Sequence, residues 1–297
     1  MSETWTVLRI LEWTRGFLES KGSLTPRLDA ELLLCRVLSM ERIALYTSYD
    51  RPLDEAERQA YRELVRRRGT GEPTQYILGE QEFWSIRIQV EPGVLIPRPE
   101  TELLVEEVLE AGRARAGEQG DGLRIADVGT GSGCIAIAIA SELPGARVVA
   151  TDIEAVPLRL ARENAKRAGV DDRIDVQVAD GLTGVSMEAG PFHLIASNPP
   201  YIPDGEFDGL MKTVRAFEPR VALTAGPEGL DVIRPLIERA SDRAVLAPGG
   251  TLAIEVSDRQ QAAKVVALLE QAEFAKTRIR LDYSGVPRVV VATASIG

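Results

Sequence analysis

Hydrophobic and polar positions along the 297-residue chain follow a helical period up to about residue 75. Apolar residues there recur three or four positions apart, which is typical of amphipathic helices. Three segments carry the pattern: residues 8–17 with Leu8, Leu11, Trp13 and Phe17, residues 25–37 opening at Thr25-Pro26, and residues 53–68 ending in Arg66-Arg67-Arg68. Cations complement the dipole at a helix C-terminus, so we expect these arginines to be solvated. The pattern predicts a small helical domain over residues 1–75.

Residues 76–96 change to a period of two. The run Ile86-Arg87-Ile88-Gln89-Val90 alternates apolar and polar side chains, as a strand with one buried face does. Glu91-Pro92-Gly93 follows it and is a turn signal. We therefore expect residues 76–96 to form a β-hairpin connector.

From residue 97 to residue 297, strand-like and helix-like segments alternate. Apolar runs occupy residues 123–128, 147–151, 174–178, 192–196 and 251–256, with helical periods at 101–111, 135–143, 157–168, 229–240 and 260–269. This alternation predicts a parallel sheet covered by helices, with a terminal strand pair at 277–281 and 289–293. The helix at 101–111 is expected to bury its leucines and valines and to expose Glu102, Glu106, Glu107 and Glu110. Residues 112–122 are expected to form a flexible loop.

Composition and charge narrow the classes of function. The formal net charge of −10 argues against a partner made of nucleic acid, because phosphate neutralisation supplies most non-specific affinity for it. No apolar run approaches the ~18–20 residues that span a bilayer, so no membrane partner is expected. The N-terminus lacks the features of a signal peptide, which predicts a cytoplasmic protein. Cys35 and Cys134 have no metal-binding spacing, so no metal site is expected, and the single histidine, His193, lies in an apolar run.

A glycine loop, Asp127-Val128-Gly129-Thr130-Gly131-Ser132-Gly133, separates a predicted strand from a predicted helix. This is the context of a nucleotide-type site. The third glycine of a dinucleotide fingerprint would fall at Cys134, so the spacing disfavours NAD. The loop suits a ligand whose amino-acid end lies against the backbone, and S-adenosylmethionine is such a ligand. Its expected contacts are Gly129, Thr130, Gly131, Ser132 and Gly133.

Three aspartates occupy the ends of three successive predicted strands. Asp152 ends the second strand, where a carboxylate can accept both ribose hydroxyls of a cofactor. Asp180-Gly181 ends the third, where a carboxylate can accept from an adenine amino group. Asp127 is expected to orient the glycine loop. Each acid alone could be a strand-end cap, but together with the loop they indicate a cofactor site.

The segment Asn198-Pro199-Pro200-Tyr201 follows the strand at 192–196. Prolines fix φ near −65° and lack an N–H, so this loop is rigid and rich in acceptor oxygens. Such a loop can hold a planar –NH2 group by its hydrogens, with Tyr201 stacking beside it. Alone the segment is more often an ordinary turn. Beside the glycine loop, it predicts a methyltransferase that acts on an amide or amine nitrogen.

These motifs give the chain a close resemblance to the release factor glutamine methyltransferases, a class I S-adenosylmethionine-dependent family. The match covers nearly the whole chain and includes these segments: residues 76–79, Val94-Leu95-Ile96-Pro97-Arg98-Pro99-Glu100-Thr101-Glu102, the glycine loop, 198–203, 217–219, 226–230 and 246–250. The resemblance implies a seven-stranded, Rossmann-like α/β methyltransferase domain after a helical domain and a hairpin. It also implies methylation of the glutamine in the Gly-Gly-Gln motif of peptide chain release factors.

The family's cofactor contacts carry over to Gly129–Gly133, Asp152, Asp180, Gly181 and Asn198, and its substrate contacts to Asn198–Tyr201. Two positions depart from the pattern, because Glu154 stands where members often have serine and Gly181 where they often have an aromatic residue. The departure at Gly181 bears on the adenine contacts.

Two other functions compete with this interpretation. The same loop could hold the exocyclic amine of a flipped adenine, which would make the chain a DNA or RNA adenine methyltransferase. Such enzymes need a basic groove, which the net charge disfavours. A binding protein that keeps the fold without turnover is the second competitor, and the complete Asn198 loop argues against it.

Overall fold

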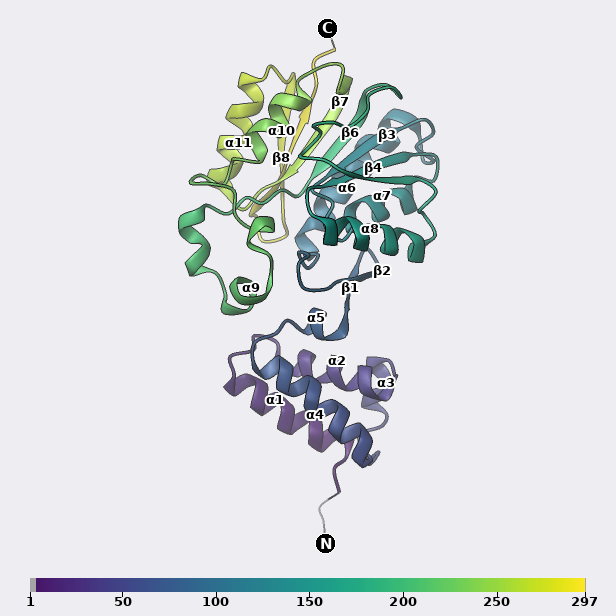
Figure 1. Cartoon of the computed structure of the whole chain (residues 1–297), viewed down its shortest axis with the longest axis vertical. Helices are drawn as coiled ribbons and strands as arrows, with labels where there is room; N and C mark the ends of the chain where they lie inside the picture. Colours follow the sequence, from purple (N-terminus) through teal and green to yellow (C-terminus); the bar gives the residue numbers. More distant parts are fainter. Residues whose placement is uncertain (1–3, 297) are drawn as a thin grey trace. The chain divides into compact units, whose positions relative to one another are not determined.

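The computed structural model describes residues 4–296, which divide into two units (Figure 1). The helical unit comprises the described residues up to Glu80 together with Met211–Phe217. The sheet unit comprises Gln81–Leu210 and the chain from Glu218 onward. The return of residues 211–217 to the helical unit was not foreseen, since no local pattern reports a partner more than a hundred residues away.

The helical unit contains α1 (Val7–Ser20), α2 (Pro26–Leu38), α3 (Arg42–Tyr46), α4 (Glu55–Gly69), α5 (Thr74–Leu78) and α9 (Lys212–Phe217). Three short helices, α3, α5 and α9, were missed, and α5 occupies the start of the segment expected to be a hairpin connector. Asp54 and Glu57 form a capping box that fixes the start of α4. Tyr61 of α4 packs in the core and donates to the Ala30 carbonyl of α2 at 3.0 Å.

The buried face of α1 differs from the expected one. Leu8 and Trp13 are 40% and 55% exposed, whereas the core side of the helix carries Val7, Ile10, Leu11, Thr14 and Leu18. Thr14 is fully buried, so the true stripe runs through a polar residue that an apolar pattern skips. Trp13 stacks on Phe17 with ring centroids 5.4 Å apart, which gives the outer face its own apolar contact.

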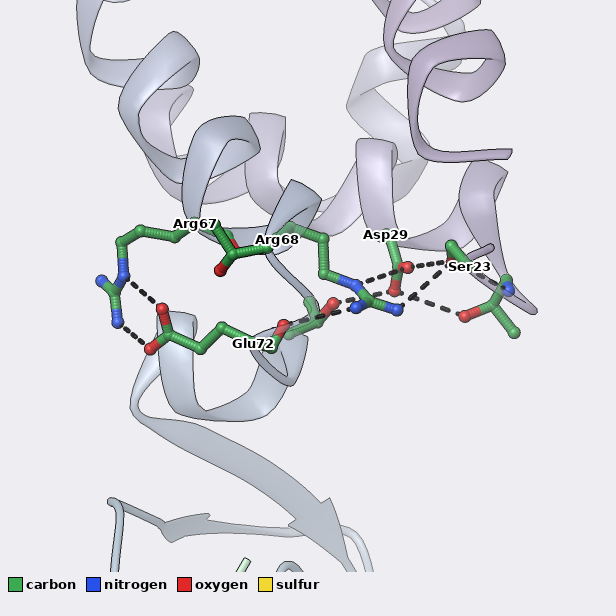
Figure 2. A network of polar contacts seen from close by, with 8 residues as sticks. Ser23, Asp29, Arg67, Arg68 and Glu72 are labelled. Atoms are coloured by element: carbon green, nitrogen blue, oxygen red, sulfur yellow. Dashed lines mark hydrogen bonds and ion pairs between the residues drawn. The ribbon is translucent and has the colours of Figure 1, made fainter. Parts of the chain in front are cut away.

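A polar network around Asp29 joins three helices of this unit (Figure 2). Asp29 is 4% exposed and accepts from Arg68 Nε at 2.8 Å, Ser23 Oγ at 2.6 Å and Thr74 Oγ1 at 2.8 Å. The expectation that all three terminal arginines of α4 are solvated is therefore wrong for Arg68, whose side chain is 11% exposed. Arg67 pairs with Glu72 beside it. A buried carboxylate needs such partners, because an unpaired buried charge is costly.

The hairpin strands are β1 (Glu80–Phe83) and β2 (Ile86–Gln89), which form a two-stranded sheet. Trp84 and Ser85 between them have φ of 54° and 57°, the left-handed values of a two-residue hairpin turn. Phe83 and Ile88 are buried in one core of the sheet unit.

The sheet unit is built on seven strands in the order β5-β4-β3-β6-β7-β9-β8. They are β3 (Arg124–Val128), β4 (Arg147–Asp152), β5 (Ile174–Val178), β6 (Phe192–Ser197), β7 (Leu246–Glu255), β8 (Lys276–Leu281) and β9 (Pro287–Thr293). Strands β3 to β7 pair in parallel, and β9 runs antiparallel to both β7 and β8. This confirms the expected α/β sheet with its terminal strand pair.

Helices cover both faces of the sheet. Alternate residues of a strand enter different cores: Ile125 faces α6 (Glu102–Ala116) and α7 (Cys134–Glu142), while Ala126 faces α10 (Ile233–Ala240) and α11 (Arg259–Gln271). Figure 1 shows these helices on opposite sides of the strands, with α8 (Ala155–Ala168) beside α7. Because both faces are buried, the strands are nearly continuous apolar runs, which is why they were found from sequence.

Two details of α6 correct the sequence analysis. The helix continues to Ala116, so the expected loop at 112–122 is helical over its first half. Glu107 is 2% exposed rather than solvated, and it forms ion pairs with Arg278 and Arg280 of β8. Glu107 was expected to be exposed with the other acids, but the antiparallel edge strand supplies cations that allow its burial.

Candidate active site

The candidate residues gather at the carboxyl ends of β3, β4, β5 and β6. The chain runs from β3 outward to β4 and β5, then returns to place β6 on the other side of β3. Ligands of open α/β sheets bind at such a switch point. The sheet topology therefore brings together the glycine loop, Asp152, Asp180 and Asn198, which span about 70 residues of sequence.

The glycine loop is held tightly against β4. Gly129 N and Thr130 N both donate to the Thr151 carbonyl, at 2.9 and 2.8 Å. Gly129, Gly131 and Gly133 have φ of 73°, 56° and 84°, values that favour glycine. A Cβ on Gly133 would lie 3.1 Å from the Cα of Ala161 in α8, so this position also needs glycine for close packing.

Asp127 lies beneath the loop and is fully buried. Its Oδ2 accepts from Thr130 Oγ1 at 2.6 Å and from Ala136 N at 3.1 Å, so the acid joins the loop to the start of α7. Burial raises the pKa of Asp127 to about 6, against the lowering effect of these two hydrogen bonds. The geometry is that expected of a residue that orients the glycine loop.

Asp152 ends β4 and lines the cavity described below. Its Oδ2 accepts from Gly131 N and its Oδ1 from Glu154 N, both at 3.0 Å. Burial raises its pKa, while the backbone N–H groups oppose the rise. Each carboxylate oxygen has a further lone pair, so the fixed carboxylate can still accept from a ligand.

Asp180 and Gly181 follow β5 and line the same cavity. The Gly181 carbonyl accepts from Thr151 Oγ1 at 2.9 Å, which ties this turn to the end of β4. Asp180 is an exposed residue at the edge of the site.

Asn198 begins the loop after β6 and is half-buried. Its Nδ2 donates to Thr101 Oγ1 at 3.1 Å. The carboxamide oxygen points away from that bond and remains an acceptor. Asn198, Pro199 and Pro200 all line the cavity.

Tyr201 takes a position that the sequence did not predict. Its ring packs against the sheet core on the side of α10 and α11, and its hydroxyl lies 3.5 Å from Glu255 Oε1. Burial raises the pKa of Tyr201. Stacking of this ring beside a bound amide stays a prediction.

The matching segments quoted from the sequence meet around the same loop. Arg98 pairs with Glu218 at 2.5 Å, and Glu218 Oε2 also accepts from Ile96 N at 3.3 Å. Gln261 of α11 donates to the Tyr201 carbonyl at 2.7 Å. A Cβ on Gly229 would lie 2.1 Å from that carbonyl oxygen, so only glycine fits there.

Three polar residues of the site were not singled out from sequence. Asn164 of α8 donates to the Ser132 carbonyl at 2.9 Å and exchanges two hydrogen bonds with Gln89 of β2. Gln261 and Glu255 support the Asn198 loop from below. A buried polar residue within an apolar helix or strand, such as Glu255 after Leu252-Ala253-Ile254, is the signal that could have found them.

These elements enclose a cavity of about 240 Å³. Its lining comes from residues 93–101, the glycine loop, 152–157, 179–181, 197–200 and 219–232. Apolar side chains and prolines make up most of its walls, together with the glycines of the loop and the Asp152 carboxylate. Such a cavity suits a ligand of nucleoside size with a cationic or hydrogen-donating end.

The single histidine and the two cysteines have structural rather than catalytic roles. His193 Nδ1 accepts from Arg124 N at 2.9 Å, and burial lowers its pKa, which confirms a satisfied ring on a strand. Cys35 and Cys134 are free thiols. Burial raises the pKa of Cys134 to about 12, so its position at the start of α7 does not make it a nucleophile.

Comparisons with known proteins agree with this architecture. Two family models match, the PrmC N-terminal domain over residues 9–79 and the Methyltransferase small domain over residues 99–215. The human METTL16 catalytic domain in complex with an RNA hairpin superposes with a TM-score of 0.57 at 15% identity, over 79% of this chain and 82% of that chain. At that identity the likeness concerns the fold alone. Fold and family model together define the protein as a class I methyltransferase.

Full-length relatives narrow the class to one family. The release factor glutamine methyltransferase of Rhodopirellula baltica is 42% identical over 96% of this chain and 95% of its own length. That of Chlorobaculum tepidum is 43% identical over 96% of both chains. The chain belongs to the release factor glutamine methyltransferase family. None of the helices in residues 4–296 combines the length and apolar character needed to cross a bilayer.

Proposed function

We propose that the protein transfers a methyl group from S-adenosylmethionine to the side-chain amide nitrogen of the Gly-Gly-Gln glutamine in peptide chain release factors. The observation that carries the proposal is the Asn198 carboxamide, whose NH2 group is engaged by Thr101 while its oxygen stays an acceptor at a cavity bordered by the glycine loop and Asp152. Family membership supports the same reaction.

The residues around the cavity fit S-adenosylmethionine. The glycine loop offers backbone without side chains, and Asp152 presents a fixed carboxylate at the end of β4. An anionic site favours a ligand that carries a sulfonium cation. When bound, S-adenosylmethionine supplies an electrophilic methyl group. Gly129–Gly133 and Asp152 would hold it, with Asp180 and Gly181 near the adenine and Asn198 near the methionine end.

The Asn198 loop would bind the glutamine amide. A primary amide nitrogen is a poor nucleophile because its lone pair is delocalised into the carbonyl group. Acceptance of its two hydrogens by the Asn198 side-chain oxygen and the Pro199 carbonyl returns electron density to nitrogen and orients it. Alignment and preorganised dipoles of this kind supply much of an enzyme's acceleration. The methylated amide releases its proton to water, so the proposal needs no general base.

The helical unit would recognise the protein substrate. The proposed cofactor and amide contacts belong to the sheet unit, and a protein partner needs an extended surface, roughly 800 Å² per partner. The outer face of α1, with Leu8 and Trp13 exposed on it, offers apolar contact area. The domain limits 1–75, 76–96 and 97–297 remain our functional division of the chain.

Methylation of adenine in DNA or RNA is the competing function. The net charge of −10 works against it, and the full-length relatives carry another name.

The test incubates the protein with isotopically labelled S-adenosylmethionine and a bacterial release factor. We expect one methyl group on the Gly-Gly-Gln glutamine, located by peptide mass spectrometry. A release factor with Gln→Glu in that motif is the matched control, because it keeps the shape and lacks the amide nitrogen. Adenine-containing single-stranded DNA and RNA form parallel reactions. Label in nucleic acid with none in the release factor would overturn the proposal.

A further inference from the structure

A set of three buried polar side chains lies directly behind the Asn198 loop. Thr101 ends the short η1 helix (Pro99–Thr101) and is 1% exposed. Glu255 ends β7, the strand next to β6, and is 2% exposed. Tyr201 contributes its hydroxyl from the loop itself. Three segments far apart in sequence therefore place hydroxyl and carboxyl groups beneath one carboxamide.

The direction of hydrogen bonding in this set is constrained by chemistry. Asn198 Nδ2 donates to Thr101 Oγ1 at 3.1 Å, so the threonine oxygen acts as an acceptor. Its own proton then needs an acceptor, and a hydrogen bond from the Thr101 hydroxyl is among the influences that lower the pKa of Glu255. In its ionised form the Glu255 carboxylate only accepts, so it then turns the threonine proton inward and the threonine lone pair toward Asn198.

The burial of the Glu255 carboxyl group has no evident structural reason. Glu255 Oε1 lies 3.5 Å from the Tyr201 hydroxyl, and Oε2 is buried without a hydrogen-bond partner among the described residues. Burial of an apolar residue at this position of an apolar strand would cost less free energy. Underpaired buried acids persist where function requires them.

We infer that Thr101 and Glu255 are positioning residues that set the orientation of the Asn198 carboxamide. The oxygen and the NH2 group of an asparagine are nearly equal in size, so a half-turn of the side chain would exchange acceptor for donor at the cavity. An NH2 group there would face the NH2 group of the substrate amide. The Glu255–Thr101 pair holds the NH2 inward, so the oxygen faces the substrate. The inference rests on the proposed function and assigns two further residues to it.

The orientation can be tested without substrate, because Asn164 and Asn198 are the only asparagines of the chain. Protein labelled with 15N-asparagine gives two side-chain NH2 signals in NMR spectra. In the wild type, the Asn198 signal should exchange slowly with solvent. In Thr101→Val, which replaces the hydroxyl by a methyl group, its exchange should accelerate at least about fivefold. The Asn164 signal should be unchanged and serves as an internal control, since its NH2 bonds lie elsewhere. Equal exchange of Asn198 in wild type and Thr101→Val would overturn the inference.

Kinetics give the second measurement, with Thr101→Ser as the variant that keeps the hydroxyl. We expect kcat on release factor to fall at least tenfold in Thr101→Val and in Glu255→Met, and less than threefold in Thr101→Ser. The Kd for S-adenosylmethionine should stay within threefold in all of them, which also shows that they fold. An equal loss in Thr101→Ser and Thr101→Val, or a kcat above half of wild type in Thr101→Val, would refute it. Absent methylation by the wild type would refute the proposed function instead, while the exchange measurement still decides the orientation.

Discussion

Replacement of Asp152 by alanine is expected to weaken cofactor binding far more than it alters folding. The carboxylate is fixed by Gly131 N and Glu154 N, each at 3.0 Å, so its free lone pairs are preset for a ligand. Hydrogen bonds to a charged group contribute roughly 1.5–3 kcal/mol. The Kd for S-adenosylmethionine should therefore rise about 10- to 150-fold. The glycine loop keeps its bonds to the Thr151 carbonyl, so the fold should survive.

Isothermal titration calorimetry of wild type, Asp152→Ala and Glu154→Ala is the direct assay. Glu154 lines the same cavity, but its backbone N–H makes the contact to Asp152, so its side chain is a matched control. Glu154→Ala should change Kd less than about threefold. Unchanged affinity in Asp152→Ala would mean that the ribose is held elsewhere. Equal losses in both variants would mean that negative charge at the cavity, rather than a placed acceptor, drives binding.

Three further results are expected. Asn198→Ala should lower kcat on release factor more than tenfold, a barrier change above about 1.4 kcal/mol, with at most a modest change in cofactor Kd; a rate above a tenth of wild type would contradict the amide-holding role. Asp29→Ala should destabilise the helical unit by about 3–5 kcal/mol, because it removes the ion-pair partner of the buried Arg68. Chemical unfolding followed by the fluorescence of Trp5 and Trp13 measures this, and Glu63→Ala, which removes an exposed ion pair, should change little. Burial raises the pKa of Glu255 from 4.5 to about 7, so the folded chain binds the proton more tightly and the free energy of unfolding falls as pH rises through that range. Glu255→Gln should reduce this fall by roughly 3 kcal/mol in pH-dependent unfolding, and an unchanged slope would show that Glu255 titrates normally.

The fold was largely predictable because its sheet is buried on both faces. Continuous apolar strands and short connections marked β3 to β6 to within a residue or two, and the strand-end acids marked the carboxyl edge. Prediction failed where burial depends on a distant partner. Glu107 is buried because it forms an ion pair with an arginine of β8. Arg68 is buried because it forms an ion pair with Asp29 of another helix. No local pattern contains either partner.

The site divides in the same way. Residues that contact a ligand through backbone geometry, such as Gly131, leave a spacing that can be found in sequence. Residues that act through another side chain show up in the sequence only as a single polar residue. Thr101 belongs to a matching segment, yet its contact to Asn198 spans 97 positions, so only the folded chain brings the two residues together.

The membership of α9 in the helical unit has a consequence for biosynthesis. The core of that unit is built from residues between Val7 and Leu78, whereas α9 arrives about 130 residues later. At roughly 5–20 residues per second, a ribosome needs on the order of 7–25 s to supply it. During that interval the surface around Gly71, where Phe217 and Thr213 pack in the finished protein, is open on the nascent chain. Strands β3 to β6 are all synthesised in the same interval, so the last helix of the helical unit is added only after most of the parallel sheet has been made.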